Sequence, residues 1–289
     1  MQFALFRSLA YRPFALIWTG QTVSRLGDSL YRIALAWWVL EKTGSATMMG
    51  TVLIFSFAPM LLFSLIGGVF VDRWPRLRIM LVSDLARGVA VGIIALLAFT
   101  QRLEIGHIYG LSILFGVVDA FFQPAYTAIV PEIASREILP SANSLTSLSG
   151  QFASIVGPAL GGVLVGAGGT ALAFALDGAS FFISAACLVP VLKIPLPFQA
   201  EKGEGHFGKE IMAGMRAVAD APWLWITISI AALLNVTMSG PLNVALPFLV
   251  KNKLHLEATT LGLISSAFAV GSVLVALWLG RYHRLRRRG

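Results

Sequence analysis

Residues 46–71 read ATMMGTVLIFSFAPMLLFSLIGGVFV and contain no charged side chain. An α-helix rises about 1.5 Å per residue, so a run of this length can cross the roughly 30 Å hydrocarbon core of a bilayer. Charge returns immediately afterwards, at Asp72 and Arg73. The stretch therefore predicts a membrane-spanning helix that ends at a polar surface.

The whole chain has the same apolar character. Only 12% of its 289 residues are charged, whereas 57% are hydrophobic and the mean hydropathy is +0.79. Soluble domains contain about 25% charged residues, and a soluble domain of this size has too little interior to bury so much apolar surface. The composition predicts an all-α polytopic membrane protein with the bilayer as solvent for most side chains.

Seven further apolar stretches resemble the first in length. The eight predicted spans are 14–40, 46–71, 78–100, 105–130, 139–166, 170–192, 222–250 and 258–280, each close to the roughly 20 residues that cross a bilayer. We divide the chain into an N-terminal six-helix transmembrane bundle (1–192), a cytoplasmic linker that contains an amphipathic helix (193–221), and helices 7 and 8 of an incomplete C-terminal bundle (222–289).

Lys and Arg are unevenly distributed between alternate loops. The N-terminal segment, the loop after the second span, the linker and the C-terminal tail hold most of them. Positively charged loops stay in the cytoplasm, so we predict a multi-pass protein of the cytoplasmic (inner) membrane with a cytoplasmic N-terminus. Because the basic residues are scattered among short loops, the net charge of +8 does not indicate a nucleic-acid partner.

A short basic motif occurs twice. Arg73-Trp-Pro-Arg76-Leu77-Arg78 follows the second span, and Arg281-Tyr-His-Arg284-Leu285-Arg286 follows the eighth. Repetition of this kind indicates a repeated structural unit. The last two spans are therefore predicted to open a second six-helix unit. On this interpretation the chain is C-terminally truncated, and residues 1–289 alone are expected to enter the membrane without catalysing export.

Three stretches are similar to a known family. Residues 68–76 (GVFVDRWPR) lie where the major facilitator superfamily has a G-x-x-x-D-R-x-G-R loop, with Trp74-Pro75 where a glycine is usual. Residues 157–162 (GPALGG) match the G-P-x-x-G-G motif of proton-coupled exporters, and residues 18–37 resemble the first helix of the drug-exporter branch. The chain thus resembles the transmembrane secretion effector branch of this superfamily, which includes macrolide and siderophore exporters.

The resemblance implies a secondary active transporter that works by alternating access. It would export small amphipathic molecules (drug, macrolide or siderophore-like) by proton antiport, with the proton gradient as energy source and no cofactor. Its partners would be the small-molecule substrate, protons and membrane lipid, and the oligomeric state is left open. The alternative is a truncated membrane fragment or assembly subunit that does not transport. An enzyme is not predicted, because the sequence shows no nucleophile–base pair or metal-binding cluster.

The first span carries a polar stripe. Its members follow i, i+4, i+7 and i+11 and so share one helical face; they are Gln21, Arg25, Asp28 and Arg32. A charge at the bilayer centre costs about 2.5–3.5 kcal/mol on insertion scales, so this face cannot contact lipid. We expect it to line a water-filled substrate or proton cavity, with a structural polar contact between helices as the alternative. The spacing predicts ion pairs from Asp28 to Arg25 and Arg32.

The fourth span has a second polar face with Ser112, Asp119 and Gln123. Asp119 is the first candidate for a carboxylate that exchanges protons near mid-membrane, and a hydrogen bond to a neighbouring helix is the alternative. In the seventh span, Asn235 and Asn243 are candidates for substrate contact or for hydrogen bonds between helices.

Two motifs supply the remaining candidates. The resemblance implies a gating loop that comprises Gly68, Asp72, Arg73 and Arg76, and we expect Asp84 and Arg87 to brace that loop from within the third span. Glycines in a membrane helix allow a second backbone to approach, and a proline kinks the helix. That role is predicted for Gly157, Pro158, Gly161 and Gly162, and the resemblance adds a role in sealing the cavity against proton leak.

Overall fold

The computed structural model describes residues 6–194, 212, 216 and 219–280. Most of the predicted amphipathic helix of the linker, and the second copy of the basic motif at 281–286, therefore lie outside the described residues. The described residues form helices and no strand. The all-α prediction is confirmed.

The helices begin and end close to the predicted spans. The elements are η1 (Arg7–Ala10), α1 (Arg12–Thr43), α2 (Ala46–Arg73), α3 (Arg76–Phe99), α4 (Ile105–Ile133), α5 (Leu139–Leu192), α7 (Pro222–Gly240), η2 (Pro241–Ala245), α8 (Leu246–Phe248), η3 (Leu249–Lys253) and α9 (Ala258–Gly280). Local sequence explains several of these limits. Gly44 takes the left-handed conformation that closes α1 (φ 61°), and the Ser45 side chain accepts a hydrogen bond from the Met48 amide at the start of α2.

Two predicted spans are joined in α5. Its backbone departs from helical geometry at Gly169, which has φ 76° and ψ 171°. Only glycine adopts such a conformation readily. The 54-residue element therefore contains two helical segments that meet at this residue, as the predicted spans 139–166 and 170–192 require.

The seventh predicted span, 222–250, is less regular than expected. The α-helix stops at Gly240, and two π-helical segments follow, separated by the three residues of α8. Pro241 and Pro247 lie in this region, and a proline removes a backbone donor from the helical ladder. The span continues to Lys253 as a segmented helix, not as a single α-helix.

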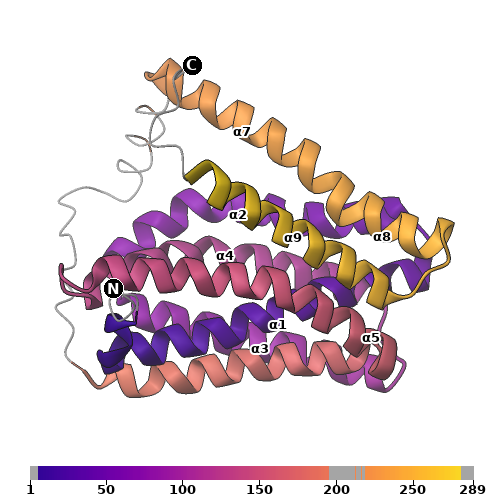
Figure 1. Ribbon diagram of the computed structural model, residues 1–289, viewed down its shortest axis with the longest axis horizontal. Helices are drawn as coiled ribbons and strands as arrows, with labels where there is room; N and C mark the ends of the chain where they lie inside the picture. Colours follow the sequence, from indigo (N-terminus) through magenta and orange to yellow (C-terminus); the bar gives the residue numbers. More distant parts are fainter. Residues whose placement is uncertain (1–5, 195–211, 213–215, 217–218, 281–289) are drawn as a thin grey trace.

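Figure 1 shows the helices as a bundle along the long axis of the molecule, with α7 leaving it at an angle. α1 packs mainly on α5, α2 on α4, and α3 on both α4 and α5. α9 packs along α5 and so attaches the last part of the chain to the first six spans. The buried apolar side chains form two large clusters, one around Phe14 and Ile17 and the other around Tyr31 and Trp38 of the same helix. A third, small cluster joins Ile33 to Val250 and Leu261.

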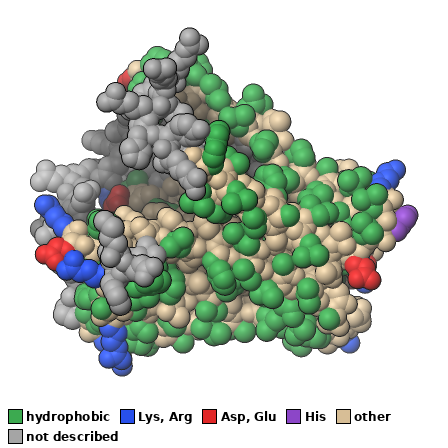
Figure 2. Space-filling model, viewed as in Figure 1, with side chains coloured by type: hydrophobic (Ala, Val, Ile, Leu, Met, Phe, Trp, Pro, Cys, Tyr) green, Lys and Arg blue, Asp and Glu red, His purple; other side chains and the backbone are tan. Residues whose placement is uncertain are grey.

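Five described helices are long and apolar enough to cross a membrane: α2, α3, α4, α5 and α9. α1 has the length but carries Arg25, Asp28 and Arg32 in its middle turns. Figure 2 shows charged side chains at the two ends of the molecule and apolar side chains between them. Large apolar residues are exposed in that middle band, as Leu62 (74%) and Val82 (65%) illustrate. This surface suits contact with lipid chains and not with water.

Candidate transport cavity

A cavity of about 300 Å³ opens among α1, α2, α3 and α4. It lies in the layer between the two large apolar clusters, where α1 carries its polar stripe. Its lining is Gln21, Ser24, Arg25, Asp28, Tyr31, Arg32, Leu35, Leu53, Ser56, Phe57, Met60, Arg87, Phe115, Gly116, Asp119, Phe122, Gln123 and Tyr126. The walls therefore combine charged groups with aromatic rings.

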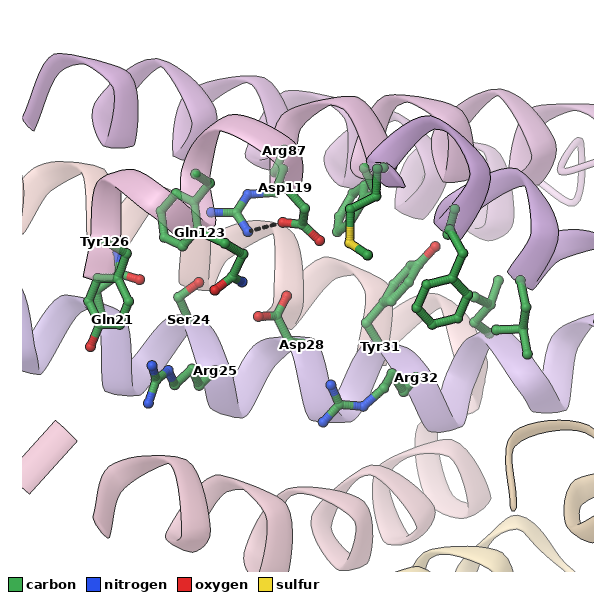
Figure 3. Close-up of a pocket in the computed structure, with 18 residues that line it drawn as sticks. Gln21, Ser24, Arg25, Asp28, Tyr31, Arg32, Arg87, Asp119, Gln123 and Tyr126 are labelled. Carbon is green, nitrogen blue, oxygen red and sulfur yellow. Dashed lines mark hydrogen bonds and ion pairs between the residues drawn. The ribbon is translucent and has the colours of Figure 1, made fainter. Parts of the chain in front are cut away.

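The structure brings six predicted residues together around this cavity: Gln21, Arg25, Asp28, Arg32, Asp119 and Gln123. In Figure 3, Asp28 and Gln123 point into the space between α1 and α4, and Asp119 lies beside Arg87. Ser112 does not join them. Its hydroxyl donates to the Ile108 carbonyl at 2.8 Å, and the residue is buried away from the cavity.

The predicted ion pairs of Asp28 are wrong. Arg25 Nη1 instead donates to the Thr146 carbonyl at 3.0 Å, and Arg32 Nη2 donates to Ser29 Oγ at 2.7 Å. The side chains of Arg25 and Arg32 thus extend away from Asp28, and each guanidinium donates to a different acceptor. Among the described residues, the Asp28 carboxylate accepts no hydrogen bond and has no ion-pair partner within 4 Å. Its carboxylate faces the cavity without a fixed partner.

Arg87 is shared between two carboxylates. Its Nη2 lies 2.7 Å from Asp84 Oδ1, and its Nη1 lies 3.4 Å from Asp119 Oδ1. Asp84 is fully buried, whereas the Asp119 side chain is 31% exposed toward the cavity. The guanidinium also lies over two rings, with Cζ 4.1 Å from the Phe122 centroid and 4.6 Å from that of Phe181. Charge and aromatic contacts together hold this cation in an apolar setting.

Gln21 extends this network behind the cavity. Its Nε2 donates to Ser184 Oγ at 2.8 Å and to Asp84 Oδ2 at 3.3 Å, and the Ser184 hydroxyl donates to Asp84 Oδ2 at 2.7 Å. Four spans are thereby joined through Asp84. The expectation that Asp84 and Arg87 brace the gating loop is wrong, because they bind α1, α4 and α5 inside the bundle. Helical periodicity shows that Asp84 and Arg87 share one face of α3, but it does not show which helices pack against that face.

Several cavity residues were not singled out from the sequence. Tyr31 stacks on Phe115 with centroids 5.6 Å apart and planes 10° apart. Tyr126 lies under the Arg25 guanidinium at 4.9 Å. Ser24 and Tyr31 lie four residues before and three residues after Asp28, on the same face of α1. The sequence would have indicated both residues if the polar stripe had been defined to include hydroxyl groups. The aromatic residues of α4 have no such signal in a helix this apolar.

Asn243 lies beside a second, smaller cavity of about 160 Å³. This cavity adjoins the first, since Arg32, Leu35 and Leu53 line both. Its other walls include Pro158 of α5 and Ser265 of α9. Asn235 lies in α7, but its side chain is outside the described part of the structure.

The glycine motif of α5 packs against two helices. A side chain at Gly157 would meet Ser29 of α1, and one at Gly161 would meet Leu30 at 3.2 Å. Gly162 faces α9, where a Cβ would lie 2.7 Å from the Ala258 carbonyl oxygen. Next to Pro158, the Ala159 amide donates to Ser266 Oγ of α9 at 3.0 Å. The close backbone approach expected of this motif is present, on both sides of α5.

The gating-loop residues lie at the end of α2 and the start of α3. Arg76 Nη1 pairs with Glu132 Oε2 of α4 at 2.8 Å, a partner that the sequence did not indicate. Asp72 is exposed, and Arg73 is partly buried at the last turn of α2. A side chain at Gly68 would meet no atom within 4 Å, whereas one at Gly67 would meet the Ala120 backbone. The loop is thus fastened to α4 through Arg76 and Gly67.

At the opposite end of the bundle, α1 contacts the segment between α7 and α9. Lys251 Nζ lies 4.0 Å from the Trp37 ring centroid and 3.6 Å from Glu41 Oε2. The Asn252 side chain donates to the Gly44 carbonyl at 3.1 Å. These contacts close this end between the two parts of the chain.

The amino-acid sequence is similar to one protein family and to several exporters of known name. The family described as transmembrane secretion effector matches residues 3–288. Macrolide efflux protein A of Streptococcus pyogenes is 25% identical over 276 residues, which are 95% of this chain and 68% of that protein. Enterobactin exporter EntS of Citrobacter koseri is 29% identical over 280 residues, 96% of this chain and 65% of that protein. The chain thus spans about two-thirds of the length of these relatives.

A bundle of apolar helices around a charged internal cavity is typical of membrane transporters, because charged side chains within the membrane face the bundle interior and mark substrate or ion pathways. The match over nearly the whole chain shows that it belongs to the transmembrane secretion effector family, and its relatives named above are exporters of the major facilitator superfamily. The resemblance inferred from residues 18–37, 68–76 and 157–162 is confirmed.

Proposed function

We propose that the protein is a secondary active transporter that exports small amphipathic molecules by proton antiport and alternating access. The relatives are named for export of a macrolide and of enterobactin, which supports an export function for this chain. A compound of either kind, drug-like or siderophore-like, is the proposed class of substrate. The proposal concerns the whole protein, since the chain covers only part of the length of those relatives.

The observation that carries this proposal is the composition of the cavity. Aromatic side chains such as Tyr31, Phe115 and Phe122 provide apolar contact surface, and Asp28 and Asp119 provide polar contacts in the same space. Small-molecule sites typically combine an apolar wall with a few polar groups that fix orientation. An amphipathic molecule matches that combination.

Proton exchange is assigned to Asp119 and Asp28. Asp119 has only a 3.4 Å contact with Arg87, which keeps its shorter contact of 2.7 Å with Asp84 when Asp119 binds a proton. The cation therefore remains compensated in both protonation states of Asp119. The Asp28 carboxylate has no fixed partner among the described residues. A proton and a positively charged group of the substrate can therefore compete for it, and binding of one displaces the other. Competition of this kind links proton entry to substrate release.

Export from cells that express the full reading frame tests the proposal. We expect Asp28→Asn and Asp119→Asn each to lower proton-driven efflux of a macrolide or siderophore at least about tenfold, because an amide cannot carry the exchanged proton. Membrane levels should stay close to wild type, since neither carboxylate anchors the fold. Glu137→Gln is the matched control, because Glu137 is exposed and its one ion-pair partner among the described residues is the exposed Arg7, at 3.2 Å.

Efflux must be measured per molecule of inserted protein, with a pH-sensitive dye recording proton entry. Unchanged efflux in both Asn variants would remove the cavity from the transport mechanism. Loss of protein from the membrane with unchanged efflux per molecule would instead assign Asp28 to structural contacts. No efflux by the wild-type protein for either class of compound would favour a membrane subunit without transport activity.

A further inference from the structure

An apolar groove of about 540 Å³ runs along the outside of the bundle, away from the transport cavity. Three spans form it, and none of its lining residues lines the central cavity. The lining is Ile66, Phe70 and Trp74 of α2 and its end, Arg78, Ile79, Val82, Ser83 and Ala86 of α3, and Val117, Val118 and Phe121 of α4. The groove belongs to the surface that a membrane protein presents to lipid.

One end of the groove is different from the rest. Trp74 is 52% exposed there and stacks on Phe70 with ring centroids 5.0 Å apart. Arg78 stands beside it in the first turn of α3. Tryptophan concentrates at the level of lipid headgroups in membrane proteins. This end therefore lies at the membrane surface, and the groove extends from it into the hydrocarbon layer.

Arg78 carries a positive charge that the described residues do not neutralise. The neighbouring Arg76 takes Glu132 as its partner at 2.8 Å. The Arg78 side chain is exposed, and its guanidinium makes no hydrogen bond or ion pair with a residue that the structure describes. A guanidinium at this level matches a phosphate group, which it can bind through two parallel hydrogen bonds.

The dimensions of the groove suit an acyl chain. From Arg78 to Ala86 along α3 the distance is about 12 Å at 1.5 Å per residue. Val82, midway along this path, is 65% exposed and leaves the groove open to the bilayer. A second protein helix would require small residues or polar groups on this face. Apart from Ser83 and Ala86, the apolar lining consists of the larger Ile, Val, Phe and Trp side chains, which favours a flexible hydrocarbon chain.

We propose that this groove is a binding site for one anionic phospholipid, with its phosphate on Arg78 and an acyl chain along α3. The predicted topology places the Arg78 end at the cytoplasmic leaflet, whose surface is negatively charged and attracts basic residues. The bound lipid fastens the α2–α3 connection to the membrane surface. This proposal requires only a membrane-inserted bundle and is independent of the proposed export.

Lipid titration monitored by native mass spectrometry tests this site on the purified 289-residue chain. We expect the first bound dioleoyl-phosphatidylglycerol to bind more tightly than dioleoyl-phosphatidylcholine. Arg78→Gln should weaken the binding of phosphatidylglycerol about fivefold, the usual contribution of one basic side chain near an anionic surface. It should weaken the binding of phosphatidylcholine less, because the choline cation offsets the attraction of that lipid's phosphate for Arg78. Arg78→Lys should retain most of the preference. Arg102→Gln is the control, because Arg102 is exposed at the other end of the bundle.

The acyl-chain part has its own pair of variants. Val82→Trp should fill the groove and weaken the binding of both lipids. Val89 is exposed on the same helix but lies outside the groove, so Val89→Trp should weaken the binding of neither lipid. Equal affinity of wild type for the two lipids, or an unchanged preference in Arg78→Gln, would overturn the headgroup assignment. Equal binding by Val82→Trp and Val89→Trp would place the lipid elsewhere and overturn the site.

Discussion

Arg87 shows how one residue can make a charged cavity compatible with a membrane. Its guanidinium is 4% exposed and has a carboxylate on each side, Asp84 behind it and Asp119 on the cavity wall. A buried ion pair contributes little net stability, but removing one partner leaves an uncompensated charge in an apolar setting. Arg87 and Asp84 are therefore expected to tolerate removal together better than removal of Arg87 alone.

This asymmetry gives a stability prediction for α3. Arg87→Gln should lower the free energy of unfolding in mixed micelles by about 3–5 kcal/mol, because Asp84 loses its countercharge while fully buried. The double variant Asp84→Asn/Arg87→Gln should recover at least half of that loss. Arg136→Gln, at an exposed position outside the network, serves as control. A double variant as unstable as Arg87→Gln alone would show that the two side chains are not energetically coupled.

At the scale of the elements, glycines decide how closely the helices approach. α1 and α5 meet at Gly157 and Gly161, and α5 and α9 meet at Gly162 and Gly262. Without a hydrophobic force between helices in lipid, such close backbone approach is a main source of packing energy. α5 therefore links the first six spans to α9, and its glycines set the geometry on both of its sides.

Two alanine substitutions separate this packing role from helix propensity. Gly157→Ala should destabilise the folded protein by about 1–3 kcal/mol, because the added methyl group meets Ser29 in a closely packed contact. Gly68→Ala should be neutral or slightly stabilising, because its methyl group meets no atom within 4 Å and alanine favours helix. Unfolding in mixed micelles measures both. Equal effects of the two substitutions would contradict the packing role of the motif.

At the scale of the whole molecule, charge and hydrophobicity are separated along one axis. The ends of the bundle carry the charged side chains and its middle is apolar, apart from the internal cavity (Figure 2). The two parts of the chain touch through Lys251 and Glu41 at one end, the end predicted to face outside. In an alternating-access transporter, contacts of this kind must open when the site turns outward.

The predicted orientation can be tested directly with reporter fusions. Fusions after residues 75 and 205 should report the cytoplasm, and fusions after residues 43, 104 and 254 should report the outside, because basic loops are retained in the cytoplasm. An alkaline phosphatase reporter and a fluorescent protein reporter give opposite signals at each site and check one another. A single pair of inverted signals would refute the topology based on Lys and Arg.

The sequence by itself determined the all-α class and, except in the seventh span, the approximate helix limits, because span length and hydropathy are local properties that the bilayer thickness constrains. It also determined the polar faces of α1 and α4, since helical periodicity places residues at i, i+4 and i+7 together. Six of the predicted cavity residues could be chosen on that basis.

Only the tertiary structure decided which partner each charged side chain takes. Spacing along α1 favoured pairs from Asp28 to Arg25 and Arg32, but the Thr146 carbonyl and Ser29 hydroxyl bind those guanidiniums instead. Likewise, Arg87 meets Asp119 because α3 packs against α4. Periodicity fixes the direction of a side chain relative to its own helix. The approach and rotation of the neighbouring helices determine what that side chain meets, and these depend on packing along the entire bundle.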